Sequence, residues 1–325
     1  MDYLSTIKAP ITPEMDLFAE RFEQALSRTD GLLSQALGYI VRRSGKRMRP
    51  ILLLLVAKNY GVPTDASYHA AVGMEMLHTA SLVHDDVVDD SGERRGQASV
   101  NAIYDNKISV LVGDYLLSTS LLSVALTGEI EIVKKVAQLG QTLVSGEILQ
   151  LSNTQSNAFS EEVYYDIIHR KTATLFEACC SLGALSVEAT PQQVEQAQAF
   201  GSDIGMIFQI RDDIFDYYPA ADIGKPTGND MAEGKLTLPL LYALNNNDDD
   251  SIRQLARKAK SGAATADEIA ALVSYAKEHG GIDYAEQRMD HYRRHAQQYI
   301  DTCVTDTDIR HALQAYLDYV IRREK

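Results

Sequence analysis

Cysteine is scarce in this 325-residue chain, and its three cysteines form no familiar pattern. Cys179 and Cys180 are adjacent, whereas Cys303 is distant, a spacing that provides neither a disulfide framework nor a zinc site. Reduced, buried thiols in an intracellular protein are expected instead. The first residues (MDYLSTIKAPITPEM) also lack the basic and apolar regions of a secretory signal. Together these absences predict a cytoplasmic protein.

Long apolar runs and an excess of basic charge are also missing. The longest uninterrupted apolar run, residues 51–57, is far shorter than the ~20 residues that span a bilayer, so no integral membrane segment is expected. There are 31 basic and 45 acidic residues, which give a net charge of −14. Because proteins that bind nucleic acid through its phosphates usually carry the opposite sign, nucleic acid is excluded as a partner.

The apolar residues that are present, 45% of the chain, recur at helical period almost everywhere and rarely alternate as in a strand. Breaks are short and no shift in composition divides the chain. We predict an all-α fold, a single large helical domain over residues 1–325. Segments 74–88 and 110–126 are apolar on more than one face, which is typical of helices inside a bundle. Pro50 is expected to open one of the buried helices.

Two acidic clusters interrupt this apolar pattern. In the first, Asp85 and Asp89 would lie one helical turn apart, and Asp86 and Asp90 would form a second such pair. Two like charges about 6 Å apart repel by about 3 kcal/mol at an effective dielectric of 20. No nearby lysine or arginine precedes the cluster to relieve this repulsion. A solvated acidic helix end is the alternative interpretation.

The second cluster, formed by Asp212, Asp213 and Asp216, repeats the D-D-x-x-D pattern. If the two helices face each other, their carboxylates converge at the end of an apolar cavity. Carboxylate oxygens are ligands suited to Mg²⁺, which keeps several waters and accepts phosphate oxygens as further ligands. The presence of two copies favours a magnesium site over two solvated acidic helix ends.

Basic residues occur where they could bind phosphate. The segment GKRMRP (45–50) places three cations before a helix, whose N-terminal N–H groups would add to an anion site. Arg94 and Arg95 follow the first acidic cluster, and bidentate arginine contacts suit phosphate. Lysines near the second cluster could be ordinary surface residues if taken singly. They are Lys171, Lys225 and Lys235.

This combination predicts a metal–diphosphate substrate with a hydrocarbon tail. The motifs of P-loop nucleotide hydrolases, serine hydrolases, zinc proteases and dinucleotide-binding enzymes are not found in a suitable context. The segments GKRMRP, LVHDDVVDDSGERRG, KT, FQIRDDIFD, GKPTGND and GKLTLPL together resemble the trans-polyprenyl diphosphate synthase family. They cover residues of about 40 to 240 in the family's order.

The resemblance implies the isoprenoid synthase (prenyltransferase) fold with a central cavity, usually in a homodimer. It also implies Mg²⁺-dependent head-to-tail condensation of isopentenyl diphosphate with an allylic diphosphate.

By matched position, Asp85, Asp89 and Asp212 would ligate Mg²⁺, with support from Asp86, Asp213 and Asp216. Isopentenyl diphosphate would be held by Lys46, Arg49, His78 and Arg95. The allylic diphosphate would be held by Arg94, Lys171, Lys225 and Lys235. Thr172 and Gln209 would lie near the reacting carbons, and Phe208 would line the site. Without the family match, His78 would be read as an ordinary core histidine.

Product length would depend on the helix face that precedes Asp85. Short-chain relatives typically carry an aromatic plug four or five residues before this aspartate, where this chain has Ala80 and Ser81. These small residues predict an open tunnel and a medium- or long-chain product. A bulky residue deeper in the tunnel, such as Met74, Tyr115 or Leu116, would instead close it.

Three alternatives stay open on sequence grounds. A short-chain farnesyl or geranylgeranyl diphosphate synthase would share all the motifs. A class I terpene cyclase is less consistent with them, because GKRMRP and the double arginine imply a second diphosphate. A non-catalytic subunit of a heteromeric synthase is also less consistent with them, because both aspartate motifs are complete.

Overall fold

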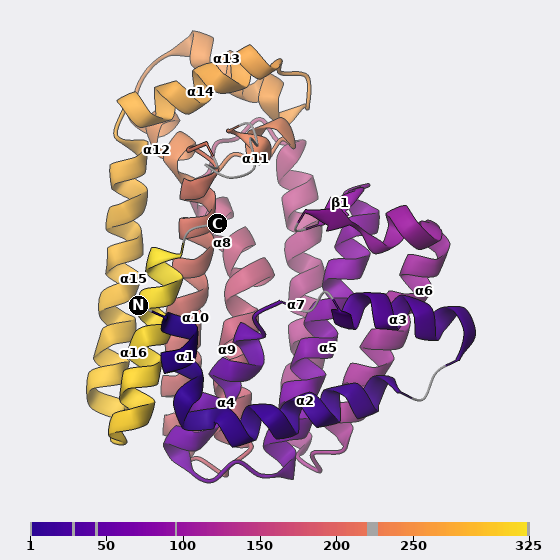
Figure 1. The fold of residues 1–325 in the computed structure, drawn as a ribbon. Helices are drawn as coiled ribbons and strands as arrows, with labels where there is room; N and C mark the ends of the chain where they lie inside the picture. Colours follow the sequence, from indigo (N-terminus) through magenta and orange to yellow (C-terminus); the bar gives the residue numbers. More distant parts are fainter. Residues whose placement is uncertain (1, 28–29, 43–44, 95, 220–226, 324–325) are drawn as a thin grey trace. The chain divides into compact units, whose positions relative to one another are not determined.

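The computed structural model describes residues 2–27, 30–42, 45–94, 96–219 and 227–323. Within them the regular structure is almost entirely helical, which confirms the predicted all-α class (Figure 1). One short antiparallel hairpin pairs β1 (Glu93–Arg94) with β2 (Gln97–Ala98). The helices are α1 (Tyr3–Lys8), η1 (Ala9–Ile11), α2 (Thr12–Leu26), α3 (Gly31–Arg42), α4 (Met48–Tyr60), α5 (Asp65–Val88), α6 (Val100–Ala125), α7 (Ile130–Thr154), α8 (Glu161–Ile168), η2 (His169–Ala173), α9 (Thr174–Leu185), α10 (Pro191–Phe215), α11 (Asn229–Ala232), α12 (Leu238–Asn246), α13 (Asp250–Lys260), α14 (Ala266–Glu278), α15 (Gly281–Cys303) and α16 (Thr307–Arg322).

The chain divides into two compact units. Unit 1 consists of Met1–Gly140, Leu175–Ala199 and Thr302–Ala315, and unit 2 consists of Gln141–Thr174, Phe200–Asp301 and Tyr316–Lys325. Helices α7, α9, α10, α15 and α16 each contribute residues to both. The first aspartate cluster and GKRMRP belong to unit 1, and the second aspartate cluster belongs to unit 2. The single domain that we expected over residues 1–325 stays a prediction.

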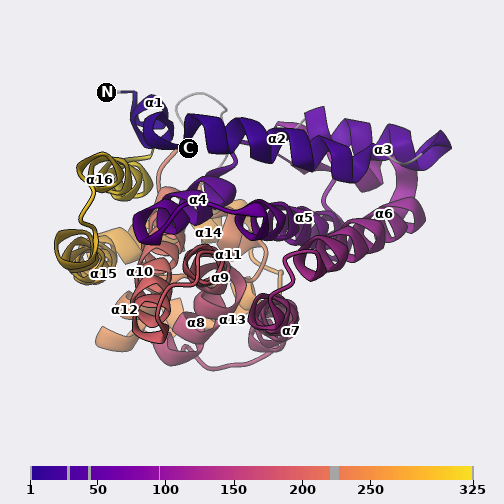
Figure 2. The same cartoon turned by 90° about the horizontal axis from the view of Figure 1, so that it is seen from below.

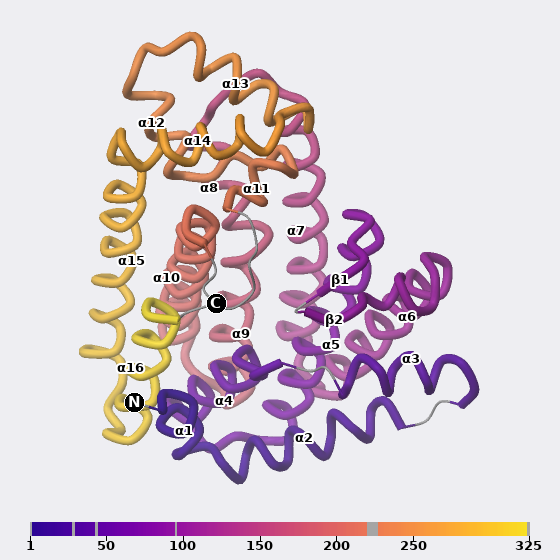
Figure 3. The backbone as a smooth tube through the Cα atoms, turned by 45° about the horizontal axis from the view of Figure 1, so that its top comes forward, coloured from indigo at the N-terminus to yellow at the C-terminus, as the bar shows by residue number. Residues whose placement is uncertain are grey.

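In unit 1, α5 and α6 lie side by side (Figure 1 and Figure 2), and glycines allow their close approach. A Cβ atom on Gly73 would lie 2.5 Å from Val124, and Ser120 Oγ donates a hydrogen bond to Gly73 O at 2.7 Å. A Cβ atom on Gly113 would lie 2.2 Å from the ring of His84. The hairpin β1–β2 then joins the end of α5 to the start of α6 (Figure 3).

Helix α4 begins earlier than the sequence suggested. It starts at Met48, two residues before Pro50, and Arg47 is its N-cap residue. The expectation that Pro50 opens the helix was therefore wrong by half a turn, because a left-handed residue at Arg47 starts it instead. Residues 51–57 of α4 are fully buried, which makes this helix the apolar centre of unit 1.

In unit 2, α10 carries the second aspartate cluster at its C-terminal end. Phe200 of this helix stacks on Tyr299 of α15, with ring centroids 4.5 Å apart. Helix α14 packs against both α12 and α13 (Figure 1). Tyr217, just beyond α10, is fully buried, and its hydroxyl accepts a hydrogen bond from Leu240 N at 3.2 Å. These contacts fix the end of α10 on the core of its unit.

One helix among the described residues, α6, is long and apolar enough to cross a membrane. In its most apolar stretch, 39% of the residues are buried in the fold. The expectation that residues 110–126 lie inside the bundle was wrong for this chain, because Leu111, Leu122 and Leu126 are each exposed by 59% or more. The expectation that the chain contains no integral membrane segment therefore stays a prediction.

Candidate functional site

The first aspartate cluster forms the end of α5. Asp85 lies in the last helical turn, and Asp89 is the C-cap residue, whose N–H donates to Asp85 O at 2.8 Å. This confirms the predicted one-turn spacing of Asp85 and Asp89. The predicted second pair was wrong, because the helix ends at Val88 and Asp90 has a left-handed backbone with φ of 48°.

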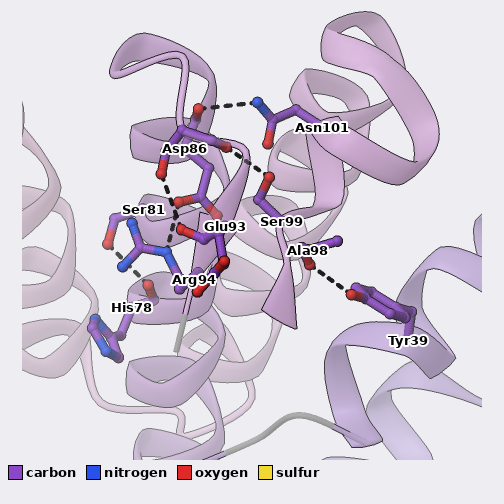
Figure 4. Close-up of polar contacts among 10 residues, drawn as sticks. Tyr39, His78, Ser81, Asp86, Glu93, Arg94, Ala98, Ser99 and Asn101 are labelled. Carbon is purple, nitrogen blue, oxygen red and sulfur yellow. Dashed lines mark hydrogen bonds and ion pairs between the residues drawn. The ribbon is translucent and has the colours of Figure 1, made fainter. Parts of the chain in front are cut away.

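The carboxylates of this cluster differ in exposure. Asp86 is buried, Asp85 is half-buried and Asp89 is exposed. Asp86 Oδ1 accepts a hydrogen bond from Arg94 Nε at 2.6 Å, and its backbone oxygen accepts one from Asn101 Nδ2 at 3.1 Å (Figure 4). Asp86 therefore supports Arg94 and the start of α6.

The arginine hairpin is held by several further contacts. Ser99 Oγ donates to Ser91 O at 2.6 Å, which closes the base of the hairpin. Tyr39 OH on α3 donates to Ala98 O on β2, also at 2.6 Å (Figure 4). These hydrogen bonds hold the hairpin, and with it the backbone of Arg94, in place. Arg95 and Lys225, predicted to bind isopentenyl diphosphate and the allylic diphosphate respectively, lie outside the described residues.

The other residues predicted to hold isopentenyl diphosphate belong to unit 1. Lys46 is exposed, immediately before the turn into α4. Arg49 is half-buried in the first turn of α4, with its guanidinium 5.3 Å from the ring centroid of Phe176. His78 is buried on α5, where its backbone oxygen accepts from Ser81 Oγ at 2.9 Å (Figure 4).

The second aspartate cluster shows the same division between exposed and buried carboxylates. The side chain of Asp212 is 48% exposed, whereas Asp213 and Asp216 are buried. Asp213 accepts hydrogen bonds from Tyr164 OH at 2.6 Å and from Gln209 Nε2 at 2.8 Å. Burial raises the pKa of Asp213 well above its usual range, so these two donors hold a carboxyl group that has little contact with water.

Asp216 connects the end of α10 to the short helix α11. Its carboxylate accepts hydrogen bonds from the backbone N–H groups of Asn229 and Asp230, each at 3.0 Å. Burial, with the charges of Asp216 and Asp212, raises the pKa of Asp230 to about 7. Asp230 is thus a further carboxyl group beside the second cluster. It was overlooked although it ends the quoted segment GKPTGND.

Lys171 and Thr172 lie in η2, a π-helical turn, and such turns often occur at functional sites. Lys171 pairs with Glu147 of α7. Thr172 Oγ1 donates to Gln209 Oε1 at 2.7 Å, and Gln209 in turn bonds Asp213. The structure thus joins three of the predicted residues in one network. Lys235 forms a separate pair with Glu233 at 2.7 Å.

Arg323 also reaches the second cluster, from the end of the chain. It lies over the ring of Phe208 at 3.7 Å from the centroid and donates to Phe208 O at 3.0 Å. It also donates to Asp212 Oδ1 at 3.1 Å. Sequence reasoning missed Arg323, Tyr164 and Glu147. The basic ending IRREK signalled the first, but no local pattern signalled the other two.

The residues suit a divalent metal. Among the described residues, no three His, Cys, Asp or Glu side chains already surround a common metal position. Asp85, Asp89 and Asp212, the predicted ligands, are accessible, whereas Asp86, Asp213 and Asp216, the predicted supports, are buried. Accessible carboxylates fit Mg²⁺, which takes its remaining ligands from water and substrate phosphate.

Comparison with known proteins identifies the family of the chain. The sequence profile of the family described as "Polyprenyl synthetase" matches residues 30–276. The chain belongs to this family. It is 35% identical over 292 residues to octaprenyl diphosphate synthase of Haemophilus influenzae, covering 89% of this chain and 87% of that protein.

Two solved structures share the fold of this polyprenyl synthetase. A geranylgeranyl pyrophosphate synthase from Bacteroides thetaiotaomicron has a TM-score of 0.87 and 49% identity, over 99% of this chain and 100% of that one. A polyprenyl synthase from Caulobacter crescentus CB15, complexed with calcium and isoprenyl diphosphate, has a TM-score of 0.90 and 28% identity, over 98% of both chains. The chain is therefore a prenyltransferase with the isoprenoid synthase fold, and an isoprenyl diphosphate synthase.

Proposed function

We propose that this prenyltransferase is an all-trans polyprenyl diphosphate synthase with a medium- or long-chain product. With Mg²⁺ it would condense isopentenyl diphosphate onto an allylic diphosphate and repeat the step on its own product. The observation that carries this proposal is the division of both aspartate clusters into accessible and buried carboxylates. The family membership and the cations beside the clusters support it.

The chain's residues would divide the work by location. Asp85, Asp89 and Asp212 would hold Mg²⁺, which when bound neutralises charge on the leaving diphosphate. Buried Asp86 would keep Arg94 in place for the allylic diphosphate. Thr172 and Gln209, hydrogen-bonded to each other, would line the reacting end of the allylic tail.

Product length rests on Ala80 and Ser81. Ala80 is buried and carries only a methyl group, and the hydroxyl of Ser81 bonds to the carbonyl of His78 in its own helix. Neither side chain can act as an aromatic plug. This supports a tunnel that continues past α5 and a product longer than geranylgeranyl diphosphate.

A geranylgeranyl product is the second candidate. It is favoured by the 49% identity to the synthase from Bacteroides thetaiotaomicron. Met74 and Leu116 are fully buried, and they would form the floor of a shorter tunnel. Purified protein incubated with labelled isopentenyl diphosphate, farnesyl diphosphate and Mg²⁺ should give a ladder that extends beyond geranylgeranyl diphosphate. A ladder that stops there would favour the second candidate, and no incorporation would reject the synthase proposal.

The enzyme would act as a homodimer. Four leucines in α6 or at its C-cap position are exposed by 46% or more: Leu111, Leu121, Leu122 and Leu126. Apolar patches of this kind usually mark an interface. Light scattering after gel filtration should give twice the chain mass for the wild type, and Leu122→Glu should lower it. A monomeric wild type would reject the dimer.

A further inference from the structure

The segment GKRMRP contains three cations, and the structure places the middle one against α2. Its guanidinium lies over Phe18 and Phe22. We infer that Arg47 is a positioning residue, which holds the turn that sets Lys46 and Arg49 for the diphosphate of isopentenyl diphosphate. This inference rests on the proposed function, because that function assigns Lys46 and Arg49 to this substrate.

The backbone at Arg47 needs support. Its φ of 54° and ψ of 40° place it in the left-handed region, and its side chain makes no capping hydrogen bond to α4. This region is unfavourable for residues other than glycine because Cβ approaches the following carbonyl oxygen. Such strained residues persist where surrounding contacts over-determine them, and they gather at functional sites.

The support comes from an aromatic pair on α2. The guanidinium carbon of Arg47 lies 5.6 Å from the ring centroid of Phe18 and 5.1 Å from that of Phe22. Both rings are buried, and their centroids are 5.7 Å apart. A planar, weakly hydrated guanidinium suits such a surface better than the ammonium of lysine does.

Helix α4 cannot easily shift to relieve the strain. Near its other end, Lys58 Nζ donates to Glu14 Oε1 on α2 at 2.5 Å and to Pro10 O at 2.7 Å. Residues 51–57 between the two ends are fully buried. Both ends of α4 are thus attached to the N-terminal helices. The chain changes direction on entering α4 through the left-handed turn at Arg47.

The turn separates the two cations that the substrate would need. Lys46 precedes it on an exposed stretch, and Arg49 follows it in the first helical turn, beside Phe176. If Arg47 leaves the left-handed region, the backbone direction changes between them. Lys46 and Arg49 are then no longer positioned together for the diphosphate, although neither side chain has been altered.

The test compares three variants in steady-state kinetics with each substrate varied in turn. Arg47→Ala removes the side chain and disfavours the turn, whereas Arg47→Gly removes the side chain but permits the turn. Phe22→Leu leaves Arg47 in place and removes one of its aromatic supports. Circular dichroism and thermal unfolding establish that each variant is folded. If Arg47→Ala fails to fold, Arg47→Gly and Phe22→Leu carry the test.

For Arg47→Ala we expect the KM for isopentenyl diphosphate to rise by roughly 5- to 30-fold, the factor that matches the cost of a left-handed residue. The KM for farnesyl diphosphate should stay unchanged. Arg47→Gly should show a smaller rise than Arg47→Ala, and Phe22→Leu should raise the same KM.

Two results would overturn the inference. Equal effects of Arg47→Ala and Arg47→Gly, with Phe22→Leu like the wild type, would mean that Arg47 contacts substrate directly. An unchanged KM in all three variants would mean that the turn needs no support. A wild type that consumes no isopentenyl diphosphate would instead reject the proposed function itself, so the two failures are distinguishable.

Discussion

Arg323 Nη2 lies 3.1 Å from Asp212 Oδ1. Arg323 thus forms an ion pair with the carboxylate that is predicted to ligate magnesium. The side chain of Arg323 is 16% exposed and lies over Phe208, so the contact is partly protected from water. A metal that binds Asp212 must compete with this ion pair.

Replacing Arg323 with alanine should therefore strengthen metal binding. We expect the dissociation constant for Mn²⁺, measured by electron paramagnetic resonance without substrate, to fall by about 1.5- to 5-fold, in line with a partly exposed ion pair. Arg322→Ala is the matched control, because Arg322 is exposed. Equal Mn²⁺ affinities in the two variants would show that Arg323 does not compete.

The accessible carboxylates should matter for turnover itself. Asp85→Ala should reduce kcat by about 100-fold or more, because electrostatic stabilisation of the leaving group is lost. Asp90→Ala, beyond the end of α5, should keep activity within a few-fold of the wild type. Near-wild-type turnover in Asp85→Ala would contradict the proposed role of Asp85 as a metal ligand.

Tyr164 should stabilise the fold through the buried carboxyl of Asp213. Tyr164→Phe removes the donor at 2.6 Å and should lower the free energy of unfolding by about 1–3 kcal/mol, the usual cost of leaving a buried polar group without its partner. Urea denaturation measures this change. Tyr165→Phe, which loses an acceptor for Arg288 Nε at 3.1 Å, should cost less. A larger loss of unfolding free energy in Tyr165→Phe than in Tyr164→Phe would refute this role of Tyr164.

Asp203 should make stability depend on pH. Burial raises its pKa from 3.8 to about 7, so the folded chain holds a proton that the unfolded chain releases. Between these two values stability should fall as pH rises, by at most about 1.4 kcal/mol per pH unit. Asp203→Asn should flatten this slope and be more stable than the wild type at about pH 8. Parallel curves of stability against pH for the wild type and Asp203→Asn would exclude Asp203 as the cause of this pH dependence.

The elements that carry the site could be predicted because their signals are local. Helical periodicity located α5 and α10, and the repeated D-D-x-x-D pattern marked the ends of both helices. The point where α5 stops was less visible. The sequence pattern continued to Asp90, but the backbone turns left-handed there.

The supporting contacts could not be predicted in the same way, because they join distant parts of the sequence. Tyr164 meets Asp213, and Arg323 meets Asp212, only after the helices have packed within unit 2. The role of Arg47 depends on φ and on two phenylalanines of α2. Neither periodicity nor motif spacing reports such pairs.

The most direct test of the account compares the product lengths of the wild type and Ala80→Phe, with labelled isopentenyl diphosphate, farnesyl diphosphate and Mg²⁺. We predict that the wild type makes chains longer than geranylgeranyl diphosphate and that the phenylalanine shortens them. Identical ladders from both proteins would contradict the tunnel past Ala80. A wild type without any condensation product would contradict the proposed synthase.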